Sequence, residues 1–154
     1  MIDERAWRTG RVGDEAEWSR RARDAGLLTA WRSFEQDAAG RWLWVQVSPF
    51  VSEADAASAL QAIPERFLRN LRAEVRVTAG TDVEPLTLRG QSVGWAHEQR
   101  TEGRRGKGIV LYSAFVVDST LAALAASGFT DSWSWSDLVD LAQTQADRVG
   151  GDRA

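Results

Sequence analysis

The sequence contains no cysteine, and it has only one histidine, one methionine and one lysine among its 154 residues. Without cysteine the chain cannot form a disulfide, bind zinc through thiolates or use a cysteine nucleophile. One histidine is too few for a histidine-based metal site, and one methionine cannot line a methionine-rich groove. We therefore expect no metal, no cofactor and a fold that depends on an ordinary hydrophobic core.

Long apolar runs and an excess of positive charge are also missing. No run approaches the ~20 apolar residues that cross a bilayer, and the first residues, 1–5, lack the apolar stretch of a signal peptide. The net charge is −3 and the pI is about 5.2, which argues against general nucleic-acid binding. As written, the sequence predicts a cytoplasmic protein without a membrane span, exported only if an N-terminal signal has been removed.

The composition is that of a globular protein, with 44% hydrophobic and 27% charged residues. A chain of 154 residues has the usual size of one domain. We expect a loosely ordered N-terminal arm over residues 1–13, a single domain over residues 14–150 and a disordered tail over residues 151–154. The arm lacks any hydrophobic period, and the tail follows two glycines.

Residues 41–47 form the most strand-prone run of the chain, Arg-Trp-Leu-Trp-Val-Gln-Val. Because side chains alternate along a strand, Trp42 and Trp44 share one face, while Leu43 and Val45 share the other. A strand that is apolar on both faces is usually covered on both. We therefore expect this strand near the middle of a sheet.

A hairpin joins this strand to residues 27–36 through the turn residues 37–40, Asp-Ala-Ala-Gly. A loop of two or four residues would place Trp31 on the face of Trp42 and Trp44. A loop of three or five residues with a bulge would place it on the opposite face. We predict the even loop.

Two capping boxes predict helix starts, one at Ser52 and Asp55 and one at Ser134 and Asp137, and residues 14–25 have weaker helical signals. Residues 119–127 favour a helix by propensity, although their place directly after a buried strand also suits a hairpin. The other expected strands are residues 74–78, 83–89, 92–100 and 109–117. Short turns between strands favour an antiparallel sheet with helices packed on it, which is an α+β domain.

Three features resemble a known group of domains. They are the run Gly40-Arg41-Trp42-Leu43-Trp44-Val45, the helix start Asp55-Ala56-Ala57, and the ending in which a strand, Gly128, Phe129 and Trp135 lead into a helix. Over residues 14–149 this layout resembles actinobacterial lipoprotein and kinase-sensor domains of the Mog1/PsbP-like group. The resemblance implies that residues 119–127 are a strand, which makes the expected order α-β-β-α-β-β-β-β-β-α. It also implies a non-enzymatic binding or sensing module with no catalytic residues to transfer.

The predicted binding residues are Trp31, Trp42 and Trp44, with Arg104 and Arg105 as a second contact. Tryptophans dominate interface hot spots and can line a ligand groove. The alternative is that these indoles belong to the core and are covered by a helix, for which the last helix is the first candidate. The glycine-rich loop over residues 101–108 suits a phosphate or an acidic partner, although a solvated hairpin tip would have the same composition.

These observations support three functional hypotheses. The first is a non-catalytic module that contacts a partner protein or a small ligand through an aromatic sheet face. The second is a small acidic immunity or adaptor protein that blocks one protein partner. The third is an enzyme that uses His97 as a general base, although a single histidine on a strand is more often structural. The oligomeric state stays open, because an exposed sheet edge could pair with a second copy.

Overall fold

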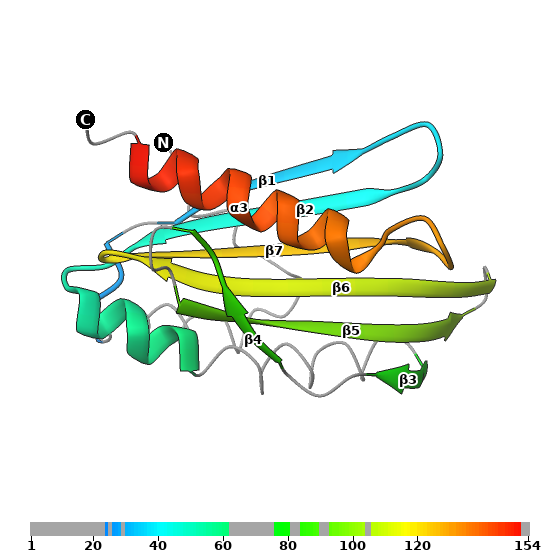
Figure 1. Cartoon of the computed structure of the whole chain (residues 1–154), viewed down its shortest axis with the longest axis horizontal. Helices are drawn as coiled ribbons and strands as arrows, with labels where there is room; N and C mark the ends of the chain where they lie inside the picture. Colours follow the sequence, from blue (N-terminus) through cyan, green and yellow to red (C-terminus); the bar gives the residue numbers. More distant parts are fainter. Residues whose placement is uncertain are drawn as a thin grey trace.

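The computed structural model describes residues 24, 26–28, 30–61, 76–80, 84–89, 93–103 and 106–151. They form a sheet of seven strands, a helix whose described part spans residues 53–61, and a C-terminal helix (Figure 1). The strands are β1 (Trp31–Gln36), β2 (Trp42–Pro49), β3 (Arg76–Gly80), β4 (Glu84–Thr87), β5 (Val93–Gly103), β6 (Gly106–Val117) and β7 (Thr120–Phe129), and the C-terminal helix is α3 (Trp135–Gly151).

All strand pairs are antiparallel, in the order β1-β2-β7-β6-β5-β3, and β4 also pairs with β5. One edge of β5 pairs with β6. The other edge of β5 pairs with β4 and β3, which lie along successive stretches of it. The described strands follow one another as predicted, and helices pack on the sheet. The chain therefore has the expected α+β fold with a single antiparallel sheet.

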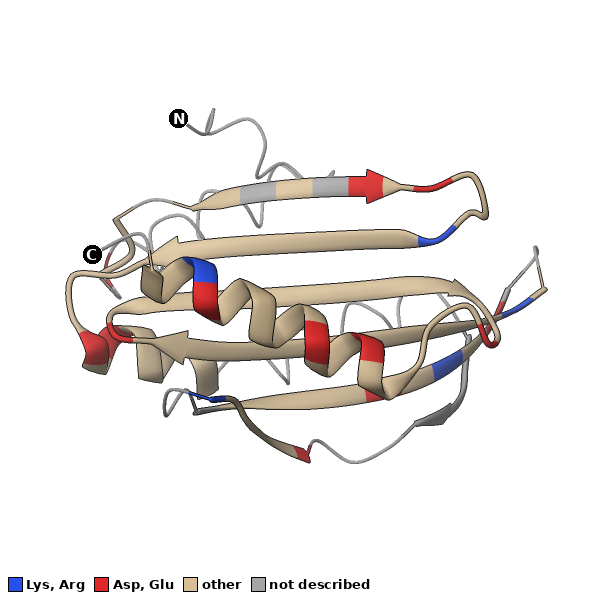
Figure 2. Cartoon of the chain, turned by 45° about the horizontal axis from the view of Figure 1, so that its top comes forward, with Lys and Arg blue, Asp and Glu red and all other residues tan. Residues whose placement is uncertain are grey.

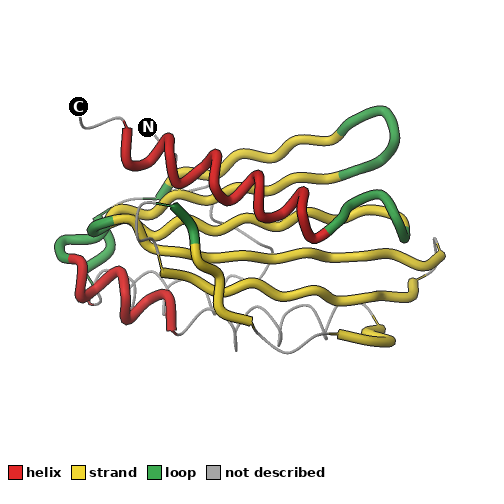
Figure 3. The backbone as a smooth tube through the Cα atoms, viewed as in Figure 1, coloured by secondary structure: helices red, strands yellow, loops and turns green. Residues whose placement is uncertain are grey.

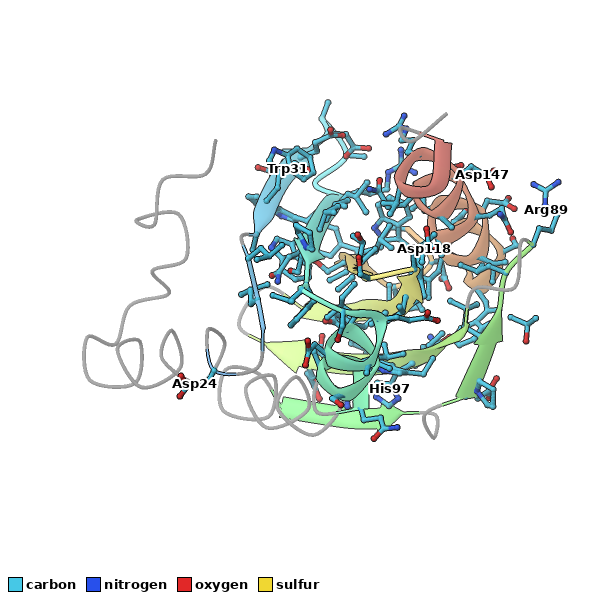
Figure 4. The ribbon with its side chains drawn as sticks, turned by 90° about the vertical axis from the view of Figure 1, so that its left-hand side faces the viewer. Asp24, Trp31, Arg89, His97, Asp118 and Asp147 are labelled. Atoms are coloured by element: carbon cyan, nitrogen blue, oxygen red, sulfur yellow. The ribbon has the colours of Figure 1, made fainter. Side chains whose placement is uncertain are left out.

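The two faces of the sheet carry separate hydrophobic clusters. On one face, which we call the α3 face, Leu138 and Ala142 of α3 pack among Val45, Phe115 and Leu124. Figure 4 looks along the strands and shows α3 within the bend of the curved sheet. The helix at residues 53–61 packs on the opposite face, in a cluster that contains Ala56, Leu60, Trp95, Tyr112 and Leu121.

Both predicted capping boxes are formed by hydrogen bonds. The amide of Asp137 donates to Ser134 Oγ at 3.2 Å, and the amide of Ser134 donates to Asp137 Oδ2 at 2.7 Å. At the other helix the amide of Asp55 donates to Ser52 Oγ at 3.1 Å, and the Ser52 hydroxyl donates to Asp55 Oδ2 at 2.6 Å. These bonds satisfy amides that have no partner inside a helix, so each helix begins where the sequence predicts.

The centre of the sheet is formed by β6 and β7. The prediction that residues 41–47 lie near the middle is wrong, because β2 is only one strand in from the edge strand β1. The residues alone left residues 119–127 undecided between a helix and a strand, and β7 confirms the strand. Tertiary pairing outweighs helix propensity here, since both neighbours of this small-residue segment offer a full ladder of backbone partners.

The turn between β1 and β2 has odd length, so the prediction of an even loop is wrong. The amide of Asp37 donates to Arg41 O at 3.1 Å, and the amide of Gly40 donates to Asp37 O at 3.1 Å. Gly40 has φ 74°, the left-handed conformation of the bulge that follows such a turn. Trp31 pairs with Val47 as a result, which places it on the α3 face and not with Trp42.

Several predictions fall on parts of the chain that are not described. These are the N-terminal arm over residues 1–13, nearly all of the helix over residues 14–25, and the end of the tail over residues 152–154. The predicted loop over residues 101–108 is too long, because the ladder between β5 and β6 continues to the pair Gly103 and Gly106. Paired backbone therefore replaces most of the expected loop.

Candidate functional site

The three predicted tryptophans do not form one surface. Trp31 is 47% exposed on the α3 face, whereas Trp42, which is 37% exposed, and Trp44 lie on the opposite face. Figure 4 shows Trp31 on β1 at one edge of the sheet, far from Asp147 on α3. A single groove lined by all three indoles is therefore excluded by the odd turn.

Trp44 belongs to an aromatic stack that crosses the sheet beneath the helix at residues 53–61. Its ring is stacked on Tyr112 at 6.3 Å between centroids, and Tyr112 is stacked on Trp95 at 5.1 Å. The indole nitrogen of Trp95 donates to Leu60 O at 3.2 Å, which ties the stack to that helix. Trp44 is thus a packing residue, on the face opposite the last helix.

The structure describes only part of the basic hairpin between β5 and β6. Arg104 and Arg105 lie outside the described residues. Arg100 is on β5, where its guanidinium pairs with Glu98 at 3.2 Å, and Lys107 is exposed on β6. The described basic residues are therefore on strands and do not form the glycine-rich cradle that the sequence suggested.

His97 lies in the interior of the domain. It is 4% exposed, directly opposite Tyr112 in the ladder between β5 and β6. Figure 4 shows it on the side of the sheet where the helix at residues 53–61 lies. His97 is therefore packed as a core side chain, and its ring is not accessible to a substrate from solvent.

The structure instead brings unpredicted residues together at the end of the sheet where β1 turns into β2. This end, which we call the hairpin end, also holds the end of β7 and the loop leading into α3 (Figure 3). A cavity of about 220 Å³ opens here, and we call it the hairpin cavity. It is lined by Glu35, Gln36, Asp37, Arg41, Leu43 and Trp133.

Asp37 holds one wall of the hairpin cavity in place. Its Oδ1 accepts hydrogen bonds from the amides of Ala39 at 3.0 Å and Arg41 at 2.9 Å, and its Oδ2 pairs with Arg41 Nε at 2.6 Å. The backbone and side-chain hydrogen bonds from Arg41 lower the pKa of Asp37 below its usual value. The carboxylate is therefore ionised at neutral pH and fixes the direction of the Arg41 side chain.

Trp133 forms the facing wall. Its indole nitrogen donates to Ser127 O at 3.0 Å, and the Arg41 guanidinium lies 5.1 Å above its ring centroid. Trp133 precedes the cap residue Ser134 and shares the α3-face cluster with Leu138, the arrangement of a hydrophobic staple. The spacing of Trp133 and Leu138 around the capping box is the signal in the sequence that could have indicated this wall.

Asp137 adds negative charge next to the cavity. Hydrogen bonds from the side chain and the backbone of Ser134 lower the pKa of Asp137, and the nearby positive charge of Arg41 lowers it further. Glu35 lies opposite Leu43 in the ladder and is exposed. Within the described part of the chain, the Glu35 carboxylate has neither a hydrogen bond nor an ion pair.

Two exposed aromatic side chains lie on the other face of the hairpin end. Trp42 pairs with Ser127, and Phe129 is the next residue of β7 on the same face, so the two rings are diagonal neighbours. Trp42 is 37% exposed and Phe129 is 56% exposed. The sequence pattern indicates Trp42 as a binding residue but not Phe129, because a residue at the end of a strand shows no alternation.

The described residues contain no group of three histidine, cysteine or acidic side chains placed to hold a metal ion. None of the helices that the structure describes has the length and apolar character needed to cross a membrane. The hairpin end therefore offers charge, aromatic surface and a cavity. Charged and aromatic side chains of this kind are common in binding surfaces.

No model of a protein family and no curated protein matches this chain. Among solved structures, it is similar to the crystal structure of LpqN, a protein involved in cell envelope biogenesis of Mycobacterium tuberculosis. The TM-score is 0.47 and the identity 12%, covering 79% of this chain and 80% of that chain. At this level the similarity supports no statement about function, and membership of the group that the sequence resembles stays a prediction.

Proposed function

We propose that this protein is a non-catalytic binding module that contacts a protein partner through the hairpin end. The observation that carries the proposal is the exposed pair Trp42 and Phe129, which lies at the same end of the sheet as the hairpin cavity but on the opposite face. Exposed aromatic and arginine side chains held on a rigid scaffold are typical of interface hot spots. Trp44 and Trp31 are not part of this surface.

Charge favours a basic partner. Asp137, Asp140 and Asp147 are exposed along α3, and Figure 2 shows acidic residues both on this helix and at the end of β1. An acidic surface speeds the encounter with a basic protein, and it makes the complex sensitive to salt. This supports the hypothesis of an acidic adaptor or immunity protein as one form of the same proposal.

The positions of His97, Asp37 and Asp137 support a function by contact. Its ring is buried in the domain, and the two carboxyl groups with lowered pKa, Asp37 and Asp137, hold a turn and a helix cap. Each of these perturbed groups therefore has a structural task. We propose on this basis that the protein is not an enzyme.

The test is capture of a partner from a lysate of the source cells, followed by titration calorimetry with the purified partner. Trp42→Ser combined with Phe129→Ser should weaken binding by at least about tenfold, as expected for hot-spot aromatics. The matched control is Leu28→Ser combined with Val51→Ser, which removes side chains that are 66% and 68% exposed near the other end of β2. Equal affinity of both double variants for the partner would contradict the proposal.

A further inference from the structure

We infer that the hairpin cavity accepts a basic side chain, lysine or arginine, from the protein partner. This inference rests on the proposed function, and it adds the chemistry of one contact. The cavity is lined by side chains of β1, β2, their turn and the loop before α3, so it is held by elements far apart in the sequence.

The balance of charge in and next to the cavity is negative. Arg41 is the one cation among the lining residues, and Asp37 lies against it at 2.6 Å. Glu35 and Asp137 add two further carboxylates without a second cation beside them in the described residues. An anion would meet these carboxylates at short range, whereas a cation would be attracted by them.

The volume and the lining of the cavity suit a long side chain. Its volume of about 220 Å³ is the space of roughly seven waters in the liquid. Leu43 and Trp133 form apolar walls for a methylene chain, and Glu35 lies directly opposite Leu43 in the ladder. Long basic side chains bury their stems along apolar surface while their charged ends stay near water.

Each group of the cavity then has a role. The Asp37 carboxylate is occupied by the turn and by Arg41, which leaves the Glu35 carboxylate as the acceptor for the incoming cation. Arg41 stays paired with Asp37 over the Trp133 ring and supports the wall.

The probes are three capped tripeptides in which glycines flank lysine, its uncharged analogue norleucine, or glutamate. NMR of the ¹⁵N-labelled full chain follows the indole N–H signal of Trp133, assigned with Trp133→Phe. The lysine peptide should shift this signal in a saturable way, with a Kd of about 1 mM for so small a ligand. The norleucine and glutamate peptides should bind at least about fivefold more weakly.

Glu35→Gln should weaken binding of the lysine peptide by about two- to fivefold, the contribution of an exposed ion pair. Glu84→Gln on β4 makes the same charge change at an exposed position outside the cavity and should leave the affinity unchanged. Equal binding of the norleucine peptide, tighter binding of the glutamate peptide, or equal effects of the two variants would overturn the inference.

The two proposals can fail separately. If the lysine peptide does not bind but the double variant of Trp42 and Phe129 still weakens partner binding at least about tenfold, the cavity assignment is wrong and the contact surface stands. If the lysine peptide binds as expected while that double variant retains its partner, the cavity accepts cations and the proposed contact surface is wrong.

Discussion

At the residue scale, two residues of the turn decide where the cavity forms. Gly40 takes a φ of 74°, which makes the loop odd, and Asp37 binds the amides of Ala39 and Arg41. The same carboxylate then pairs with the Arg41 side chain and directs it over Trp133. One aspartate thus connects the shape of the turn with the wall of the cavity.

The first prediction concerns the pH dependence of this turn. The folded-state pKa of Asp37 is lowered from 3.8, so its ionised form contributes stability above the unfolded value, and this is lost as pH falls through the folded value. NMR titration of the Asp37 carboxyl carbon should give a midpoint below 3.8. In Asp37→Asn the acid-induced shift of the Arg41 amide should disappear, and a midpoint at or above 3.8 in the wild type would contradict the prediction.

The second prediction concerns a glycine inside the sheet. A Cβ at Gly94 would overlap Ala114 O and lie 2.6 Å from Phe115 Cβ, so β5 and β6 would have to separate. Gly94→Ala should lower the free energy of unfolding by about 1–3 kcal/mol or more, measured by urea denaturation. Gly151→Ala at the end of α3 is the control, because a Cβ there meets no atom within 4 Å.

At the element scale, α3 begins where it does because its cap and its staple agree. Ser134 and Asp137 bind each other's amides, and Trp133 joins the cluster of Leu138. The helix therefore starts with its acidic residue near its positive end and its apolar face on the sheet. The same cap places Asp137 next to the cavity.

The third prediction tests this cap. Ser134→Ala should lower the free energy of unfolding by about 0.5–2 kcal/mol, because the amide of Asp137 loses its acceptor. Ser136→Ala is the matched control, since its hydroxyl contacts only the Ser134 hydroxyl among the described residues, at 3.0 Å. Its effect should stay within about 0.5 kcal/mol. Chemical denaturation followed by circular dichroism measures both, and equal losses would show that the cap contributes nothing.

At the scale of the whole molecule, one sheet separates two hydrophobic clusters that share its central strands. Leu124 and Phe115 face α3, whereas Ala123 and Tyr112 face the helix at residues 53–61. If β6 or β7 left the sheet, the hydrophobic clusters on both faces would be exposed to solvent. We therefore expect both faces to unfold together.

The fourth prediction follows from this shared sheet. Circular dichroism and tryptophan fluorescence should report a single coincident unfolding transition. Phe115→Ala should destabilise the protein by about 3–5 kcal/mol and move both signals equally, although the substitution lies on one face only. Val51→Ala, at a residue that is 68% exposed, should leave the midpoint nearly unchanged. Two separated transitions in the wild type would contradict the shared core.

The elements could be predicted because their signals are local. Capping residues stand within three positions of their partners, and strand alternation shows in any short window, so Ser52, Ser134 and the order of strands follow from the chain itself. Residues 119–127 show the limit. Their propensity favours a helix, but β2 and β6 on either side make them a strand.

The candidate site could not be predicted in the same way. Trp42 was indicated because a tryptophan on a strand is conspicuous, but its partner Phe129 and the cavity residues Glu35, Arg41 and Trp133 come from separate segments. Trp31 was assigned to the wrong face because the turn differs from the expected one by a single residue. An error of one residue reverses every side chain of a strand.

By itself the sequence determined the α+β class, the positions of β1 to β6 and the starts of two helices, because each depends on neighbouring residues. Only the tertiary structure decided which strands are neighbours in the sheet, the odd length of the β1–β2 turn and the contact between Arg41 and Trp133. These depend on backbone partners and contacts between distant segments, whose free energies have no counterpart in any short stretch of the chain.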